Sequence, residues 1–153
     1  MKLSIVMVGR TDRGFVGEGM AHYLDRLAHS AVVEQVVVAE ESHGPQVRRQ
    51  EVEAERMLAA VRPGGRVVAL DERGKNMTSP ALAEQLGSWR DHGVRHITLL
   101  IGGSYGLHER VRERADLVLA LSRMTFPHQL VRVVLAEQLY RAFSILQGRP
   151  YHH

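Results

Sequence analysis

The sequence predicts one α/β domain, a mostly parallel sheet covered by helices on both faces. Short runs of β-branched and aliphatic residues alternate strictly with amphipathic segments, which is typical of parallel strands joined by crossover helices. A chain of 153 residues is long enough to bury a proper core and suits a single domain. No internal repeat, linker or low-complexity tract divides it. We therefore expect one domain that spans residues 1–153.

Five apolar runs are the predicted strands. The first follows Met1 and Lys2 and is too short for a signal segment or a membrane span, and no small-residue cleavage site comes after it. We interpret it as the first strand of a soluble, cytoplasmic protein. The five runs cover residues 3–8, 32–39, 66–70, 96–101 and 117–121.

Five further segments are the predicted helices. Pro63-Gly64-Gly65 breaks the chain before the third strand, and Gly93 ends the third helix. Ser79-Pro80 predicts an N-cap followed by proline at the first helical position. The predicted helices cover residues 15–27, 47–61, 80–91, 108–115 and 128–147.

Apolar residues surround the last predicted helix almost completely. A single sheet covers only one stripe of a helix, so the remaining apolar face needs another cover. A second copy of the chain in a twofold homodimer is the economical candidate. The helix also carries His128, Arg132, Glu137 and Arg141. Polar groups among aliphatic neighbours cost free energy unless something satisfies or uses them, so this helix is a candidate functional element.

The composition limits the classes of function. Cysteine is absent, which removes disulfides, thiolate nucleophiles and cysteine-type zinc sites and fits a reducing compartment. The net charge is +3, and 18 of the 20 basic residues are arginine, the side chain that binds phosphate in a bidentate way and stacks on bases. A bias toward arginine in the coding DNA is the simpler explanation of that count. The charge permits RNA binding without establishing it.

A glycine-rich segment, 102–106, follows the fourth strand and offers two interpretations. It matches the G-x-S-x-G nucleophile elbow, and Asp116 and His128 follow Ser104 in the order found in α/β-hydrolases. The alternative function is therefore a serine hydrolase, although the chain is short for that fold and lacks an HGGG-type oxyanion segment. Otherwise the glycines let the backbone pass close to a ligand at the carboxyl end of a parallel strand.

Two more loops are expected at strand ends, at residues 71–75 after Leu70 and directly after Leu121. Together with segment 102–106 they could converge on one ligand. No complete G-x-G-x-x-G or Walker signature is present, which disfavours dinucleotides and nucleoside triphosphates.

His92 and His96 lack the further ligands that a metal needs, and Gly93 lies between them, so we predict no metal.

The final third of the chain resembles a family of ribosomal RNA methyltransferases of the SPOUT class. The resemblance covers the whole chain and is most specific in segments 101–107, 122–129, 132–142 and 150–152. It implies a parallel α/β sheet with a C-terminal trefoil knot, S-adenosylmethionine bound in the knot, and a homodimer. It also implies methylation of N3 of the pseudouridine at position 1915, in helix 69 of 23S rRNA, on assembled ribosomes. A knot runs against the usual rule of unknotted chains, so only the resemblance suggests it.

The resemblance also implies roles for individual residues. His128 is the preferred general base, Glu137 is either a base or an ion-pair partner of Arg141, and Arg132 or Arg141 could stabilise charge developing on the target base. A ribosome-binding module without a cofactor is the non-enzymatic alternative. The expected catalytic residues are His128, Arg132 and Glu137. The expected substrate-binding residues are Arg141, Tyr151 and His152, and looser candidates for phosphate contacts are Arg10, Arg13, Arg26 and Lys75. The expected cofactor-binding residues are Leu70, Gly102, Gly103, Leu121, Ser122, Arg123, Met124, Thr125 and Phe126.

Overall fold

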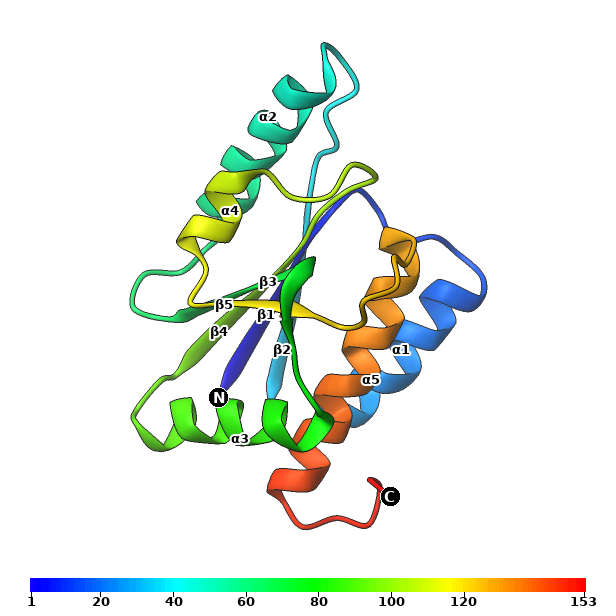
Figure 1. Ribbon diagram of the computed structural model, residues 1–153. Helices are drawn as coiled ribbons and strands as arrows, with labels where there is room; N and C mark the ends of the chain where they lie inside the picture. The colour runs from blue at the N-terminus through cyan, green and yellow to red at the C-terminus, as the bar shows by residue number, and fades with distance from the viewer.

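A five-stranded parallel sheet lies between two layers of helices in the computed structural model, which describes residues 1–153 (Figure 1). Strands and helices alternate along the chain, as predicted. The elements are β1 (Lys2–Val8), α1 (Phe15–Leu27), β2 (Val32–Val38), α2 (Gln46–Ala59), β3 (Arg66–Asn76), α3 (Ser79–Asp91), β4 (His96–Ile101), α4 (Glu109–Arg114), β5 (Leu117–Ala120) and α5 (His128–Leu146).

The sheet has the strand order β2-β1-β4-β3-β5, and all paired strands run parallel. Side chains alternate between its two faces, so each central strand contributes to two separate cores. In β1, for example, Leu3, Ile5 and Met7 belong to the larger core, whereas Val6 and Val8 belong to the smaller one. A sheet that is buried on both faces explains why these strands are predominantly apolar.

The helices divide between the two faces according to their apolar residues. Helices α1, α3 and α5 cover the face of the larger core, and α2 and α4 cover the other. In α1 the buried residues Val16, Met20, Leu24 and Leu27 follow helical spacing and form one stripe. This three-layer arrangement confirms the predicted fold class.

The third strand departs from the prediction. It continues past Leu70 to Asn76, because its second part pairs with β5 after an irregularity between Leu70 and Lys75. The separate loop predicted at 71–75 is therefore wrong. In Figure 1 this part of β3 passes across β5, and a Cβ atom at Gly74 would lie 2.5 Å from the carbonyl oxygen of Val118. The crossing fits the expected C-terminal trefoil knot.

The start of α3 also differs from the prediction. Its N-cap is Thr78, one residue before the expected Ser79, and the Thr78 hydroxyl accepts a hydrogen bond from the backbone N–H of Ala81 at 3.2 Å. Ser79 instead donates to the Gln138 side chain in α5 at 2.6 Å. The pair ties the beginning of α3 to the last helix.

Candidate active site

A crevice opens at the carboxyl edge of the sheet, where β4, β5 and the first part of β3 end. The chain leaves β4 toward α4 on one face of the sheet, whereas it leaves β3 and β5 toward α3 and α5 on the other. Loops that diverge in this way leave a binding crevice between them. The resulting cavity measures about 590 Å³, which lies in the range of small-molecule sites.

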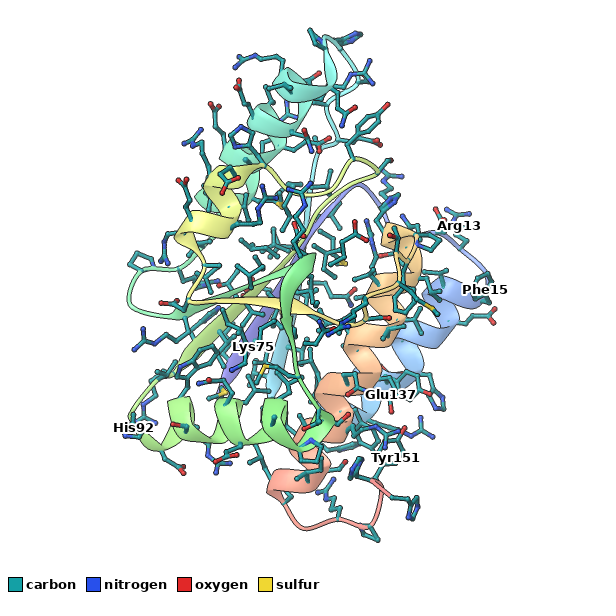
Figure 2. All side chains as sticks on the ribbon, viewed as in Figure 1. Arg13, Phe15, Lys75, His92, Glu137 and Tyr151 are labelled. Atoms are coloured by element: carbon teal, nitrogen blue, oxygen red, sulfur yellow. The ribbon has the colours of Figure 1, made fainter.

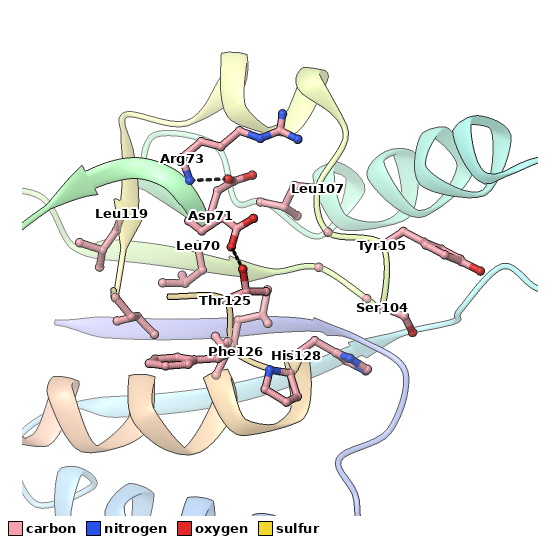
Figure 3. A pocket seen from close by; sticks show the side chains of 18 of the residues that line it. Leu70, Asp71, Arg73, Ser104, Tyr105, Leu107, Leu119, Thr125, Phe126 and His128 are labelled. Atoms are coloured by element: carbon pink, nitrogen blue, oxygen red, sulfur yellow. Dashed lines mark hydrogen bonds between the residues drawn. The ribbon is translucent and has the colours of Figure 1, made fainter. Parts of the chain in front are cut away.

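Three segments that are far apart in the sequence line this cavity (Figure 3). They are the end of the first part of β3 at residues 70–73, the glycine-rich turn 101–107, and the loop 121–128 that leads into α5. The predicted convergence of three strand ends is therefore confirmed. Of the residues expected to bind a cofactor, those in the cavity lining are Leu70, Gly102, Gly103, Leu121, Ser122, Met124, Thr125 and Phe126.

The glycine-rich turn lines the cavity with bare backbone. Gly103 and Gly106 form an antiparallel bridge, and Gly106 has a φ of 78°, a conformation that favours glycine. A Cβ atom at Gly102 would lie 2.9 Å from the backbone of Gly106, and one at Gly103 would lie 3.2 Å from Val8 Cγ1. Side chains at these positions would disrupt the turn, so the glycines are needed for its shape.

The loop after β5 is held by polar contacts made by its own residues. The Ser122 hydroxyl accepts a hydrogen bond from the backbone N–H of Met124 at 3.0 Å, and the Thr125 hydroxyl donates to the carboxylate of Glu72. The second contact joins this loop to β3 across the cavity (Figure 3). Met124 is 76% exposed, which leaves its apolar side chain available at the cavity mouth.

An ion pair that sequence reasoning missed supports the same cavity. Arg112 of α4 donates to Asp71 at 3.1 Å and to the carbonyl oxygen of Leu107 at 2.8 Å. Gln50 of α2 donates to the carbonyl oxygen of Tyr105 at 2.8 Å. These side chains fasten the turn to β3 and α2. The sequence carried no periodic or motif signal that would single out Arg112 or Gln50, because their partners are backbone groups and a distant strand.

His128 begins α5 and lines the cavity. Burial, and then the charge of Arg132, lowers the pKa of His128 below its usual value of 6.5, although Glu40 and Asp12 act in the opposite direction. The ring is therefore neutral at neutral pH and able to accept a proton. This placement agrees with the role expected of His128 as a base.

The alternative serine-hydrolase triad is not assembled. Ser104 and His128 both line the cavity. Asp116, however, lies just before β5 at the opposite, amino edge of the sheet, where it binds Arg66 and the backbone N–H of Val67 at 3.2 Å and 2.8 Å. Parallel strands separate their two edges by their full length, so this carboxylate cannot orient His128.

Arg132 does not line the cavity. Its side chain is fully buried, and its guanidinium donates to the carbonyl oxygens of Val8 and Gly9 at 2.8 Å and 3.0 Å and to the Thr11 hydroxyl at 2.9 Å. Its Nε has no partner. The structure thus gives Arg132 contacts to the end of β1 in place of the direct contact with substrate that the sequence suggested.

Glu137 and Arg141, farther along α5, form a second cluster with Tyr151, which follows the helix. Figure 2 labels Glu137 and Tyr151. Glu137 accepts hydrogen bonds from Arg141 Nη2 at 2.6 Å and from the Tyr151 hydroxyl at 3.0 Å, and Arg141 also contacts His152 at 3.1 Å. Burial, and then the hydrogen bond to Glu137, raises the pKa of Tyr151 to about 12. Glu137 lies nine positions after His128, roughly 14 Å along a helix. One chain therefore does not bring this cluster to the cavity.

Comparison with known proteins identifies the family. A family model described as "Predicted SPOUT methyltransferase" matches residues 1–152. The chain belongs to the SPOUT methyltransferase family. The resemblance seen in the final third of the sequence is thus confirmed over nearly the whole chain.

Relatives of this SPOUT methyltransferase share its full length. Proteins named ribosomal RNA large subunit methyltransferase H from Rhodospirillum centenum and Geobacter metallireducens are 46% and 44% identical, and the alignments cover 99% and 100% of this chain and 99% of each relative. A probable methylase family protein from Haemophilus influenzae has a TM-score of 0.60 at 13% identity, covering 99% of this chain and 70% of that chain. The SpoU methyltransferase AviRb from Streptomyces viridochromogenes has a TM-score of 0.51 at 17% identity, covering 96% and 61%.

The structure contains neither a helix suited to a membrane span nor a cluster of metal-ligating side chains. No helix combines the length and apolar character that crossing a membrane requires. No three histidine, aspartate or glutamate side chains gather where they could hold a metal ion. The cavity at the carboxyl edge is therefore the site on which a functional account rests.

Proposed function

We propose that this protein transfers a methyl group from S-adenosylmethionine to 23S rRNA, at N3 of pseudouridine 1915 in helix 69 of the assembled ribosome. The observation that supports this most strongly is full-length identity of 44% and 46% to proteins named ribosomal RNA large subunit methyltransferase H. The cavity adds a physical argument, because it combines bare backbone, apolar side chains and a neutral histidine in one place.

The cavity fits the cofactor. Gly102 and Gly103 line the cavity with backbone alone, in a turn too close to Gly106 and Val8 for larger side chains, and backbone groups of this kind can hold the adenine and ribose of a nucleoside. Leu70, Leu121 and Phe126 supply apolar surface for the adenine ring. When bound, the cofactor supplies an electrophilic methyl group, so the enzyme needs no nucleophile of its own. Ser104 is then one position in a cofactor-binding turn.

The remaining chemistry falls to residues of the chain. Methyl transfer forms the bond between the methyl carbon and N3 of the pseudouridine and breaks the bond from that carbon to the sulfonium sulfur, which leaves as the thioether of S-adenosylhomocysteine. N3 must also lose its imide proton. His128 accepts that proton, because it is neutral and lines the cavity. Holding the reacting groups in line contributes up to roughly 7–11 kcal/mol to such a reaction. The rigid turn 102–106 and the loop 121–127 provide this alignment.

The enzyme acts as a homodimer whose active sites are shared. Leu130 and Val134 of α5 are only partly buried and lie outside both cores, and Phe15 at the start of the adjacent helix α1 is 76% exposed. A second copy would cover this apolar face. It would also bring the cluster of Glu137, Arg141, Tyr151 and His152 to the partner's cavity, which neither chain achieves alone.

A transfer assay tests the proposed function. Purified protein, S-adenosylmethionine with a labelled methyl group, and ribosomes from cells lacking the corresponding gene should give label in 23S rRNA, and His128→Asn should remove most of it. Calorimetry on the same protein should show cofactor binding. A protein that binds ribosomes without binding the cofactor would instead be a ribosome-binding module.

A further inference from the structure

The arginines of this chain differ in whether carboxylates neutralise them. Near the amino edge of the sheet, Arg62 pairs with Glu34 at 3.2 Å and Arg66 pairs with Asp116 at 3.2 Å. Arg48, Arg56, Arg110, Arg112, Arg114 and Arg141 also have carboxylate partners.

Four exposed arginines on segments at the carboxyl edge of the sheet have no carboxylate within 4.0 Å. They are Arg10, Arg13, Arg73 and Arg123. Arg73 lines the cavity, and Arg123 lies between Ser122 and Met124, which both line it. Unneutralised cations therefore gather at the end of the molecule where the cavity opens.

Arg10 and Arg13 lie on the loop after β1, which contacts the start of α5, and Figure 2 labels Arg13 there. Gln129 of α5 fixes this loop twice, since its Oε1 accepts from the backbone N–H of Asp12 at 2.8 Å and its Nε2 donates to the carbonyl oxygen of Arg10 at 3.0 Å. Gln129 directly follows His128 in the sequence. The two arginines are thus attached to the same helical turn as the proposed base.

Arg132 holds the same loop from the protein interior, through hydrogen bonds to Val8, Gly9 and Thr11. A fully buried arginine without a carboxylate partner is costly. Its three hydrogen bonds all go to the end of β1 and the loop that follows. A loop held in this way presents its side chains without a further loss of backbone entropy on binding.

We infer that Arg10, Arg13, Arg73 and Arg123 bind the phosphates of the RNA strand that flanks the target nucleotide. The inference rests on the proposed function and assigns the surface that holds its substrate. Guanidinium groups bind phosphate oxygens in a bidentate way, and such contacts fix the register of the strand without reading its sequence. Two carboxylates on the same segments as these arginines interact with other groups. Glu72 accepts a hydrogen bond from Thr125, and Asp12 lies close to the buried charge of Arg132.

The test compares two double variants with one single variant. The double variants are Arg10→Ala/Arg13→Ala and Arg73→Ala/Arg123→Ala, and the single variant is Arg95→Ala. Arg95 is the matched control, because it is equally exposed and unpaired but precedes β4 at the opposite edge. Binding to a helix 69 hairpin is measured by fluorescence anisotropy at several salt concentrations. Each double variant should bind more than about tenfold more weakly and reduce the salt slope by about 1.4–1.8, the value for two lost phosphate contacts. Arg95→Ala should match the wild type.

Gln129→Ala separates the position of these arginines from their charge. It should weaken hairpin binding and raise KM for ribosomes while the salt slope stays close to the wild-type value. Double variants with unchanged slope and unchanged KM would overturn the inference. Loss of binding together with a change from dimer to monomer in light scattering would also overturn it, by assigning the arginines to contacts between subunits. Hairpin binding is measured without methyl transfer, so failure of this inference can be distinguished from failure of the proposed function.

Discussion

At the scale of single residues, His128 and Arg132 show how one helix serves two purposes. They lie four positions apart in α5, but His128 faces the cavity whereas Arg132 is buried against the end of β1. Their charges are coupled, since Arg132 contributes to the lowered pKa of His128. The buried arginine thus holds the loop after β1 and keeps the histidine neutral.

The lowered pKa of His128 predicts the pH dependence of methyl transfer. The neutral ring is the active form, so the rate should be constant near neutral pH and fall only as the pH drops through a value below 6.5. His128→Asn should lower the single-turnover rate by about 10²–10⁴-fold, the usual contribution of a general base, and should abolish this acidic limb. Cofactor affinity, measured by calorimetry, serves as the control and should be unchanged. An acidic limb that persists in the variant would remove His128 from the role of base.

At the scale of secondary structure elements, the crossing of β3 and β5 leaves no room for a side chain at Gly74. A Cβ atom at Gly74 would lie 2.5 Å from the Val118 carbonyl oxygen and 2.7 Å from its carbon. The φ of Gly74 is not positive, so contact alone requires the glycine. The crossing leads directly into the loop that lines the cavity.

Gly74→Ala should therefore destabilise the fold. Separating two paired strands to admit one methyl group should lower the free energy of unfolding by about 1–3 kcal/mol, measured by urea denaturation. Lys75→Ala is the matched control, because Lys75 is the next residue and is exposed. Equal stability of the two variants would show that the strands separate there without cost.

The boundaries of most elements could be predicted from the sequence, but the crossing could not. Alternation of β-branched runs with amphipathic segments is a local signal, and it placed α1 and β4 at their observed bounds. The pairing of Lys75 and Asn76 with β5 joins residues more than 40 positions apart, and no local pattern encodes it. Likewise, polarity in an apolar helix marked Arg132 as important, whereas only its distant carbonyl partners revealed what it binds.

At the scale of the whole molecule, the functional residues divide into two groups that one chain keeps apart. His128 and the loops proposed to bind the cofactor line the cavity at the carboxyl edge, whereas Glu137 and Arg141 lie farther along α5 and Tyr151 follows the helix. Figure 2 labels Glu137 and Tyr151. A twofold dimer that joins the first group of one chain to the second group of its partner resolves this separation. It would also bury the exposed side chain of Phe15.

Mixed dimers test this arrangement. His128→Asn and Arg141→Ala chains, co-expressed with different affinity tags, should each be inactive as homodimers. The purified heterodimer should recover about half of the wild-type rate per dimer, because twofold symmetry places both changes in one site and leaves the other intact. A heterodimer without activity would place both residues in the same site of a single chain.

The most direct test of the central claim is the mass of the helix 69 fragment of 23S rRNA from cells that lack this gene. The fragment should be lighter by one methyl group, and the missing group should map to the pseudouridine at position 1915. The wild-type gene should restore the group, whereas the gene encoding His128→Asn should not. A fragment of unchanged mass in the cells without the gene would contradict the proposed function.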